Sequence, residues 1–249
     1  KCGSRCIKYF GAGTEKLEAE LAQLLPQARV IRMDRDTTGR KHAHEEILAH
    51  FRRRDYDILL GTQMVAKGHD LPGVQTVGII SADASLNLPD FRAAERCFML
   101  ITQTAGRAGR HGARGEVIVQ TYNPEHYAVQ SALRQDYEAF YAQEIVLRRE
   151  LFYPPLSRLV KLLFHQMDRQ RAWDAAAAFA DVFQNEFHGR QGYMLVGPSP
   201  ALIAQERGEY RFVVLIKVAD LVDVQDFLRE QGMHLRDDVA IDIDPITIF

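Results

Sequence analysis

The sequence is poor in cysteine and contains no long hydrophobic run. Only three cysteines occur among 249 residues, too few for the disulfide framework of a small secreted protein. No apolar run approaches the roughly 18–20 residues that a membrane-spanning helix requires, and no signal-peptide pattern is present. These absences predict a cytoplasmic protein that has no membrane partner.

The sequence also has no large excess of positive or of negative side chains. Lysine and arginine total 31 against 33 aspartates and glutamates, a net charge of −2, which excludes a uniformly basic nucleic-acid coat protein but not a local basic face. Hydrophobic residues make up 47%, enough for the core of one large domain or two smaller ones. Because the chain begins Lys1-Cys2-Gly3-Ser4 without methionine, we expect it to be a piece of a longer protein.

The phosphate-binding pattern G-x-x-x-x-G-K-[ST] is absent from all 249 residues. Backbone amides of that loop cradle nucleotide phosphates, and an acidic residue elsewhere holds Mg²⁺. Either the half of a nucleotide site that carries this loop lies upstream of Lys1, or the protein is no ATPase, and in both cases the chain alone is not expected to hydrolyse a nucleotide.

Short apolar runs alternate with amphipathic stretches over residues 9–123. Nearly all-apolar runs are typical of strands that are buried on both faces of a parallel sheet. Their alternation with helices predicts a parallel sheet covered by helices, with ligands at the carboxyl ends of the strands. Strands are expected at 28–33, 57–61, 74–80 and 116–121, and helices at 14–25 (capped by Thr14), 42–53 and 91–105.

A smaller second domain is predicted after residue 155. One amphipathic helix is expected over 124–150, and Tyr153-Pro154-Pro155 would end it at a domain boundary. The remaining pattern predicts an α+β domain with helices on one face of a mostly antiparallel sheet. Its expected elements are strands at 158–167, 193–196 and 238–244, a hairpin at 201–217, and helices at 170–188 and 220–231.

The strongest chemical signal is the segment Gln103–Arg110 (QTAGRAGR), which places two arginines three residues apart near a helix end. A guanidinium binds phosphate oxygens through two parallel N–H donors, and glycine permits a close approach. Arg107 and Arg110 would therefore suit the terminal phosphate of a nucleotide. A solvated basic helix end is the alternative, and the spacing alone leaves both open.

Two weaker signals lie upstream. Gly61-Thr62 follows a predicted strand and offers amides and a hydroxyl to a phosphate, although a long polar loop explains it equally well. Residues 29–54 contain eight basic and four acidic residues, a local charge of +4. Its loop residues Arg35, Arg40 and Lys41 are candidate phosphate contacts, whereas 52–54 are favoured as a solvated helix end.

In order and spacing, GTQMVAKGHDLPGV, SADASLNLPDFRAAER and QTAGRAGRHGARGEVIVQT resemble the second RecA-like lobe of superfamily 2 helicases, and within it the primosomal replication-restart DNA helicases of bacteria. The likeness extends through GAGTEKLEAEL, MDRDTTGRK, YPP, VGPSPA, GEYRF and DIDP, so it covers essentially the whole chain. It implies an α/β, RecA-like parallel-sheet helicase lobe followed by a small α+β C-terminal domain. The implied domains are a zinc-insertion remnant (1–8), the lobe (9–123), a connecting helix and proline hinge (124–155) and the C-terminal domain (156–249).

The resemblance also implies residue roles. Arg110 stands at the family's arginine-finger position, with Arg107 and Gln103 in the same catalytic motif, and ATP with Mg²⁺ would occupy a site that a missing lobe completes. Gly68 and Asp70 would couple the nucleotide to DNA, and Asp70 could also accept a hydrogen bond from a ribose hydroxyl. Thr62 stands where such lobes touch the DNA phosphate backbone, and the positive charges of Lys67, Arg35, Arg40 and Lys41 add further candidate DNA-binding residues.

The amino-terminal cysteines resemble the end of the family's zinc-binding insertion. Cys2 is implied as its last zinc ligand, whereas Cys6 departs from the family spacing, and two thiolates do not complete a tetrahedral site. Zinc is therefore expected in a full-length protein and doubtful in this chain. Cys97, on an apolar helix face, is interpreted as core packing.

The implied function is that of the C-terminal portion of an ATP-dependent 3′–5′ DNA helicase, which remodels stalled or abandoned replication forks and starts primosome assembly. Its implied partners are forked and single-stranded DNA, single-stranded-DNA-binding protein and other primosome proteins. The alternative is a non-catalytic RecA-like module that binds DNA or protein. Arg207, Tyr210 and Arg211, at the predicted hairpin, would either contact nucleic acid or pack there and pair with glutamates.

Overall fold

The computed structural model describes residues 13–34, 36–39, 42–62, 71–109 and 115–248. It divides into two compact units, one formed by residues 1–88 and 94–140 and the other by 89–93 and 141–249. The main division, between residues 140 and 141, falls inside the segment that the sequence predicts as a connection. Residues 89–93 belong to the second unit, although the residues before and after them belong to the first.

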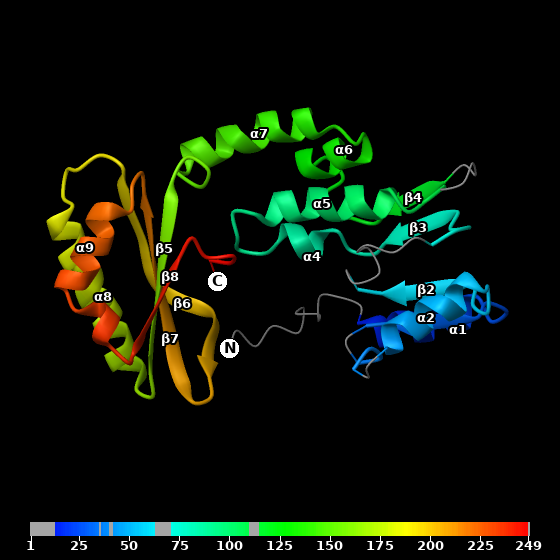
Figure 1. Ribbon diagram of the computed structural model, residues 1–249, viewed down its shortest axis with the longest axis horizontal. Coiled ribbons are helices and arrows are strands. Elements are labelled where there is room, and N and C mark those ends of the chain that lie inside the picture. The colour runs from blue at the N-terminus through cyan, green and yellow to red at the C-terminus, as the bar shows by residue number, and fades with distance from the viewer. Residues whose placement is uncertain (1–12, 35, 40–41, 63–70, 110–114, 249) are drawn as a thin grey trace. The chain divides into compact units, whose positions relative to one another are not determined.

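The first unit is an α/β structure with parallel strands, as predicted (Figure 1). Strand β1 pairs with β2, and β3 pairs with β4, each in parallel. Its elements are α1 (Thr14–Leu24), β1 (Val30–Met33), α2 (Ala43–Arg52), β2 (Ile58–Gly61), β3 (Thr76–Ile79), α4 (Asp83–Leu86), α5 (Ala93–Ala105), β4 (Glu116–Val119) and α6 (Tyr127–Leu133).

Two apolar clusters hold this unit together. Met33, Leu48 and Leu71 are buried between α2 and the β1–β2 pair. Cys97 and Ile101, both fully buried on α5, belong to the second cluster with residues of β3 and α6. The prediction that Cys97 packs in the core is confirmed, and burial together with the charge of Asp83 raises the pKa of its thiol to about 11.

The single helix predicted over 124–150 is wrong. The structure has two helices there, α6 and α7 (Tyr137–Glu150). Gln135 adopts a left-handed φ of 55°, and the Asp136 carboxylate accepts a hydrogen bond from the backbone N–H of Ala139 at 2.9 Å, in the manner of an N-cap. The apolar periodicity runs through this break, so periodicity alone could not reveal it.

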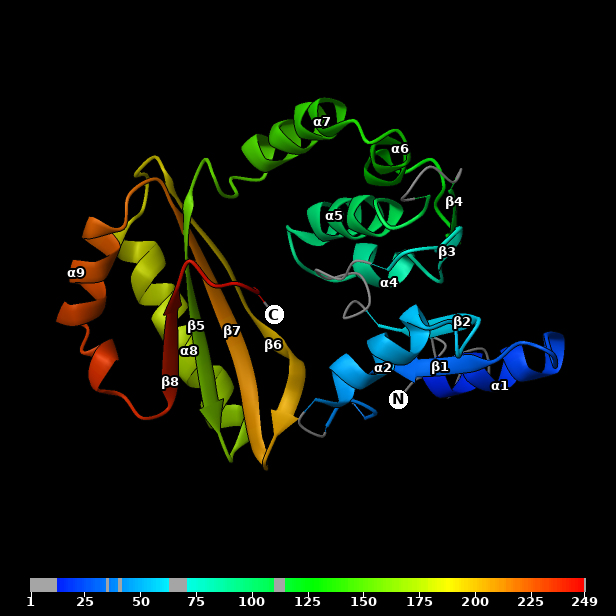
Figure 2. The same cartoon turned by 45° about the vertical axis from the view of Figure 1, so that its right-hand side comes forward.

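The second unit is a four-stranded antiparallel sheet in the order β6-β7-β5-β8. Helices α8 and α9 cover one face of it, as predicted (Figures 1 and 2). After α7 its elements are β5 (Arg158–Gln166), α8 (Arg169–Glu186), β6 (Tyr193–Glu206), β7 (Glu209–Val218), α9 (Val222–Glu230), the 3-10 turn η2 (Met233–Leu235) and β8 (Val239–Ile243).

One strand of this sheet is longer than the sequence predicts. The strand expected at 193–196 and the first arm of the hairpin are a single element, β6, whose pairing with β7 shifts register between Val196 and Ser199 and again between Pro200 and Gln205. Pro198 and Pro200 have no N–H to donate, so the ladder is interrupted while the backbone stays extended. The prolines therefore mark irregular pairing on an edge strand rather than a loop.

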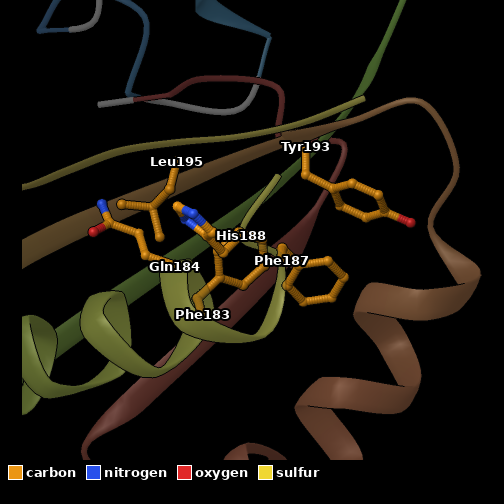
Figure 3. Close-up of a pocket in the computed structure, with 6 residues that line it drawn as sticks. All are labelled: Phe183, Gln184, Phe187, His188, Tyr193 and Leu195. Atoms are coloured by element: carbon orange, nitrogen blue, oxygen red, sulfur yellow. The ribbon is translucent and has the colours of Figure 1, made fainter. Parts of the chain in front are cut away.

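The core of the second unit is aromatic. Phe164 and Phe183 are almost completely buried, and the Phe183 ring stacks on that of Phe187 with centroids 4.5 Å apart. A shallow cavity of about 220 Å³ lies beside these rings at the end of α8 (Figure 3). No predicted site residue lines it. In the described part of the chain, no helix has both the length and the apolar character that crossing a bilayer demands.

Candidate functional site

Three of the predicted site residues lie within the described structure, namely Thr62, Gln103 and Arg107. The other eight lie outside the described residues: Cys2, Arg35, Arg40, Lys41, Lys67, Gly68, Asp70 and Arg110. The geometry of the site is therefore that of α5, of the turn after it, and of the strand ends.

Helix α5 ends in a tight turn over residues 106–109, named here the arginine turn. The N–H of Gly106 donates to the carbonyl of Thr102 and that of Arg107 to the carbonyl of Thr104, at 3.1 and 3.0 Å. Gly109 has a left-handed φ of 72°, a conformation that favours glycine. Its N–H donates to the Val74 carbonyl at 3.1 Å, so the turn is attached to the segment just before β3.

A second glycine lets the chain pack against the arginine turn. A Cβ on Gly115 would lie 2.4 Å from both the carbonyl carbon of Ala108 and the nitrogen of Gly109, which is closer than non-bonded atoms can approach. The segment that leads into β4 therefore runs directly over the turn. Gly106 and Gly109 are the glycines predicted to allow a phosphate to approach, whereas Gly115 allows the protein's own backbone to approach.

The arginine turn lies where strands begin. Val74 precedes β3 and Gly115 precedes β4, so Arg107 is held near the amino ends of these strands, at the end of a helix as the sequence predicts. A helix that connects parallel strands runs back across the sheet, so its carboxyl end returns to the edge where strands start. Thr62, which is exposed, follows the carboxyl end of β2.

Side chains on α5 and its turn differ in exposure. Gln103 is exposed and Arg107 is half-buried. Arg107 is therefore partly shielded from water, which strengthens its interaction with a bound anion, while the exposed Gln103 amide can donate and accept hydrogen bonds. This arrangement suits the recognition of an anion.

Carboxylates already neutralise part of the basic stretch 29–54. The Arg29 guanidinium donates to the Asp57 carboxylate at 3.0 and 2.8 Å, and this pairing, with the backbone N–H of Arg29, lowers the pKa of Asp57 to about 2. Arg32 lies 2.8 Å from an Asp34 oxygen and 3.3 Å from a Glu18 oxygen. Asp57 and Glu18 lie outside the stretch, so its local charge count overstated the free positive charge.

Asp34 is a structural residue that sequence reasoning missed. Its carboxylate is buried, accepts hydrogen bonds from the backbone N–H groups of Asp36 and Thr37, and accepts one from the Thr14 hydroxyl at 2.7 Å. Burial opposes its ionisation, but the bonds from Thr14 and Thr37 and the charge of Arg32 lower the pKa of Asp34 overall.

The Asp34 contacts correct the predicted start of the first helix. The sequence predicts Thr14 as the N-cap, but Gly13 occupies that position without a side-chain cap. The Thr14 hydroxyl donates its hydrogen bond to the Asp34 carboxylate instead. The signal in the sequence was Asp34 followed by Thr37, the spacing of an Asx-type turn.

A buried carboxylate also ties the ends of β3 and β4 together. Asp83, 4% exposed, accepts hydrogen bonds from the Thr121 hydroxyl and the Tyr122 N–H, each at 3.0 Å. Ser81, between β3 and Asp83, has a left-handed φ of 65°. These contacts fix the carboxyl edge of the β3–β4 pair, and periodicity could not assign them because they join residues far apart in the sequence.

At the hairpin between β6 and β7, one of the two arginines pairs with a glutamate, which is the structural alternative to a nucleic-acid contact. Arg211 is ion-paired with Glu206, and His165 lies 2.9 Å from Glu209. Arg207, at the tip, is exposed and has a left-handed φ of 52°. Arg211 is therefore occupied by a glutamate, as one of the two hypotheses predicted.

The described residues do not fit a metal ion. No group of three or more histidine, cysteine or acidic side chains there is arranged to hold one. The buried Cys97 thiol, with its raised pKa, is a poor source of the thiolate that zinc binds. The question of Cys2 lies outside the described residues.

Comparison with known proteins identifies both units. The helicase conserved C-terminal domain model matches residues 3–112, and the primosomal protein N C-terminal domain model matches residues 149–246. The chain is 42% identical to the replication restart protein PriA of Bacillus subtilis over 98% of its own length and 31% of that protein. For the proteins of the same name in Chlamydia pneumoniae and Treponema pallidum the identities are 40% and 39%, over 100% and 99% of the chain and 34% and 38% of those proteins.

The chain thus spans about a third of the length of these curated relatives. The two matched domains follow one another in the order of the two structural units. The chain therefore belongs to the PriA family and corresponds to its C-terminal part, a helicase C-terminal domain followed by the primosomal C-terminal domain.

Proposed function

We propose that this chain is the C-terminal portion of an ATP-dependent 3′–5′ DNA helicase that remodels stalled or abandoned replication forks and starts primosome assembly. The strongest support for the proposal is that a helicase C-terminal domain and a primosomal C-terminal domain follow one another along the sequence of this chain. Forked and single-stranded DNA, single-stranded-DNA-binding protein and other primosome proteins are its proposed partners, and the cytoplasm is its proposed location.

The chain would supply the cationic half of an ATP site. Gln103, Arg107 and Arg110 would face the terminal phosphate, and a second lobe would contribute the phosphate loop and the acidic partner of Mg²⁺. An arginine finger stabilises the charge that develops during phosphoryl transfer and contributes factors of about 10³–10⁵ in rate. The arginine turn supports this role because Gly109 and Gly115 hold its backbone in one conformation, so the reaction would need little reorganisation.

DNA would bind at another edge of the lobe. Thr62, exposed after β2, would donate its hydroxyl to a DNA phosphate, and Gly68 and Asp70 would link that strand to the nucleotide. The other proposed phosphate contacts are Lys67, Arg35, Arg40 and Lys41. Arg29 and Arg32 are left out because carboxylates already hold them.

Zinc belongs to the proposal only for the full-length protein. Cys2 would be one thiolate ligand of a module whose other ligands lie elsewhere, and the ion would cross-link that module as a structural element. The described residues supply no further ligand group.

The proposal is tested by comparing the 249-residue chain with the full-length protein. We expect the full-length protein to hydrolyse ATP in a DNA-dependent manner, and the chain alone to hydrolyse none even when DNA is added, because the phosphate loop is absent from it. DNA-stimulated turnover by the chain alone would contradict the division of the site. A full-length protein that never hydrolyses ATP would favour the non-catalytic binding module.

Changing Thr62 to alanine in the full-length protein is expected to reduce DNA stimulation of ATP hydrolysis about tenfold, because a hydrogen bond to a charged group contributes about 1.5 kcal/mol or more. The KM for ATP should change less. Stimulation is measured at saturating ATP over a range of DNA concentrations. Thr76→Ala is the matched control, since Thr76 is also exposed but lies at the amino end of β3. If DNA stimulates ATP hydrolysis by the Thr62→Ala variant as strongly as it stimulates the control variant, Thr62 serves only the structure of its loop.

A further inference from the structure

Strand β6 forms one edge of the four-stranded sheet, and among the described residues no strand pairs with its outer side. At the start of its ladder with β7, the Ala219 N–H donates to the Gly192 carbonyl at 3.0 Å. The next pair along the ladder is Tyr193 with Val218. Hydrogen-bonded and non-hydrogen-bonded pairs alternate in an antiparallel ladder, so Tyr193, and Leu195 two residues on, belong to non-hydrogen-bonded pairs. Their backbone N–H and C=O groups therefore point away from β7, towards the open edge.

The side chains of Tyr193 and Leu195 border a cavity on the helix-covered face of the same edge. Both pack against the aromatic core of the second unit. The cavity, named here the α8–β6 pocket, has a volume of about 220 Å³ (Figure 3). This is below the roughly 300–1,000 Å³ of a small-molecule site, but it accommodates one aliphatic or aromatic side chain. The residues that line it are Phe183, Gln184, Phe187, His188, Tyr193 and Leu195.

A strand added at this edge would bring a side chain to the α8–β6 pocket. In an antiparallel partner strand, the residue opposite Leu195 would accept the Leu195 N–H and donate to the Leu195 carbonyl. Side chains of directly opposite residues lie on the same face of a sheet. The side chain of that partner residue would therefore lie beside Leu195 on the helix-covered face, where the pocket is. The backbone groups and the pocket thus act on the same residue of one extended segment.

The length of the regular edge favours a short segment over a second copy of this chain. The β6–β7 register is regular from Tyr193 to Val196 and then shifts. Beyond the shift, Pro198 and Pro200 have no N–H to offer a further strand. Two copies that met through 193–196 alone would not reach the roughly 1,200–2,000 Å² that a stable interface buries. A short segment, in contrast, gains about four backbone hydrogen bonds and one anchored side chain.

The edge is uncharged, which indicates the chemistry of the segment. No charged residue occurs from Tyr193 to Gln205. Just beyond α8, Arg190 lies 3.2 Å from Glu186 and 3.9 Å from Asp223, so these charges are paired among themselves. Loss of hydration beside the aromatic rings of the pocket would penalise a charged side chain there. An uncharged segment with an apolar side chain opposite Leu195 therefore matches this edge.

We propose that β6 is a docking site for an uncharged, extended segment of another protein, which adds to the sheet as a further strand and places a leucine or phenylalanine side chain in the α8–β6 pocket. Backbone hydrogen bonds give this site its affinity for an extended chain, and the pocket selects the side chain. The inference goes beyond the proposed ATPase function and does not depend on it, because every residue of the site lies in the second unit.

The test titrates the 249-residue chain with fluorescently labelled peptides of about six residues, a usual strand length, and follows their anisotropy. The peptides are capped at both ends and carry serine and threonine around one central leucine, phenylalanine or alanine. The leucine and phenylalanine peptides are expected to bind at least about tenfold more tightly than the alanine peptide, because only they bury a large apolar side chain. Equal affinity of all three, or no binding at about 1 mM, would overturn the proposal.

Methylation of single peptide nitrogens tests the added strand itself. An N-methyl group on the central residue removes the N–H that would donate to the Leu195 carbonyl, so we expect affinity to fall about tenfold. The same group on the next residue of the peptide should have little effect, because that N–H points away from β6. If both methylated peptides bind as tightly as the unmodified one, no strand is added at this edge.

Gln184→Trp tests the pocket from the protein side. Gln184 is exposed and lines the pocket, so an indole there would fill the space that the peptide side chain needs, and the leucine peptide should bind about tenfold more weakly. Asn185→Trp is the matched control, since Asn185 is the next residue of α8, is exposed and does not line the pocket. Circular dichroism checks that both variants are folded. Equal affinity of the two variants for the leucine peptide would contradict the proposal.

Sedimentation velocity distinguishes a peptide segment from a second copy of the chain. We expect the chain without peptide to be monomeric at micromolar concentration, as the short regular edge implies. A dimer that Gln184→Trp dissociates and Asn185→Trp does not, together with absent peptide binding, would assign this edge to a second copy and overturn the proposal.

Discussion

Replacing Arg110 by alanine in the full-length protein is expected to lower the kcat of DNA-dependent ATP hydrolysis by about 10²-fold or more. The guanidinium would act on charge that develops in the transition state, so the KM for ATP and the affinity for DNA should change much less than kcat. Arg110 itself lies outside the described residues, but it directly follows the arginine turn, whose backbone is held by Val74.

Steady-state kinetics at saturating DNA would measure this effect, with DNA binding determined separately by titration. Arg110→Lys tests the chemistry more finely, because an ammonium keeps the charge but lacks the planar pair of donors, and we expect it to restore only a small part of the activity. Arg149→Ala controls for the loss of an arginine elsewhere. If Arg110→Ala turned over at the wild-type rate, Arg110 would have no catalytic role and would be only a solvated cation near a helix end.

Changing Gly115 to alanine is expected to destabilise the helicase lobe by about 1–3 kcal/mol, the usual cost of forcing extra volume into a packed site. The added Cβ would lie 2.4 Å from backbone atoms of Ala108 and Gly109, and backbone cannot rotate away as the end of a side chain can. Relief of the clash must move the arginine turn or the start of β4. We therefore also expect kcat in the full-length protein to fall about tenfold.

Gly78→Ala is the matched control for this substitution. Gly78 lies in the middle of β3, and no atom would come within 4 Å of an added Cβ there. Thermal unfolding monitored by circular dichroism, together with the ATPase rate, compares the two variants. Equal stability of Gly115→Ala and Gly78→Ala would show that the segment before β4 does not press on the arginine turn.

The arrangement of the lobe suggests how one chain could serve two ligands. Arg107 lies near the amino ends of β3 and β4, while Thr62 follows the carboxyl end of β2. Under the proposed function, ATP would then be met beside the β3–β4 pair and DNA at the end of the β1–β2 pair.

Much of the fold followed from the sequence because the relevant forces are local or periodic. Nearly all-apolar runs predicted the parallel strands, and most helices and strands of the second unit lie close to their predicted positions. Errors arose where one side chain or one backbone angle decides the outcome. The helix break at Gln135 and Asp136 leaves the apolar periodicity intact, and the prolines of β6 resemble a loop although the backbone there stays extended.

The sequence by itself determined the family, the order of the two domains and the residue types of the candidate site, because motif spacing and apolar periodicity are properties of the chain alone. Tertiary structure decided which charges are free and which glycines serve packing. The Arg29 guanidinium is paired with the carboxylate of Asp57, 28 residues away, and is therefore not available to a ligand. Gly115 packs so closely on the backbone of Ala108 that a Cβ would not fit between them. Phe91 joins Tyr153 across 62 residues of chain. Such contacts depend on distances in space, which no local pattern encodes.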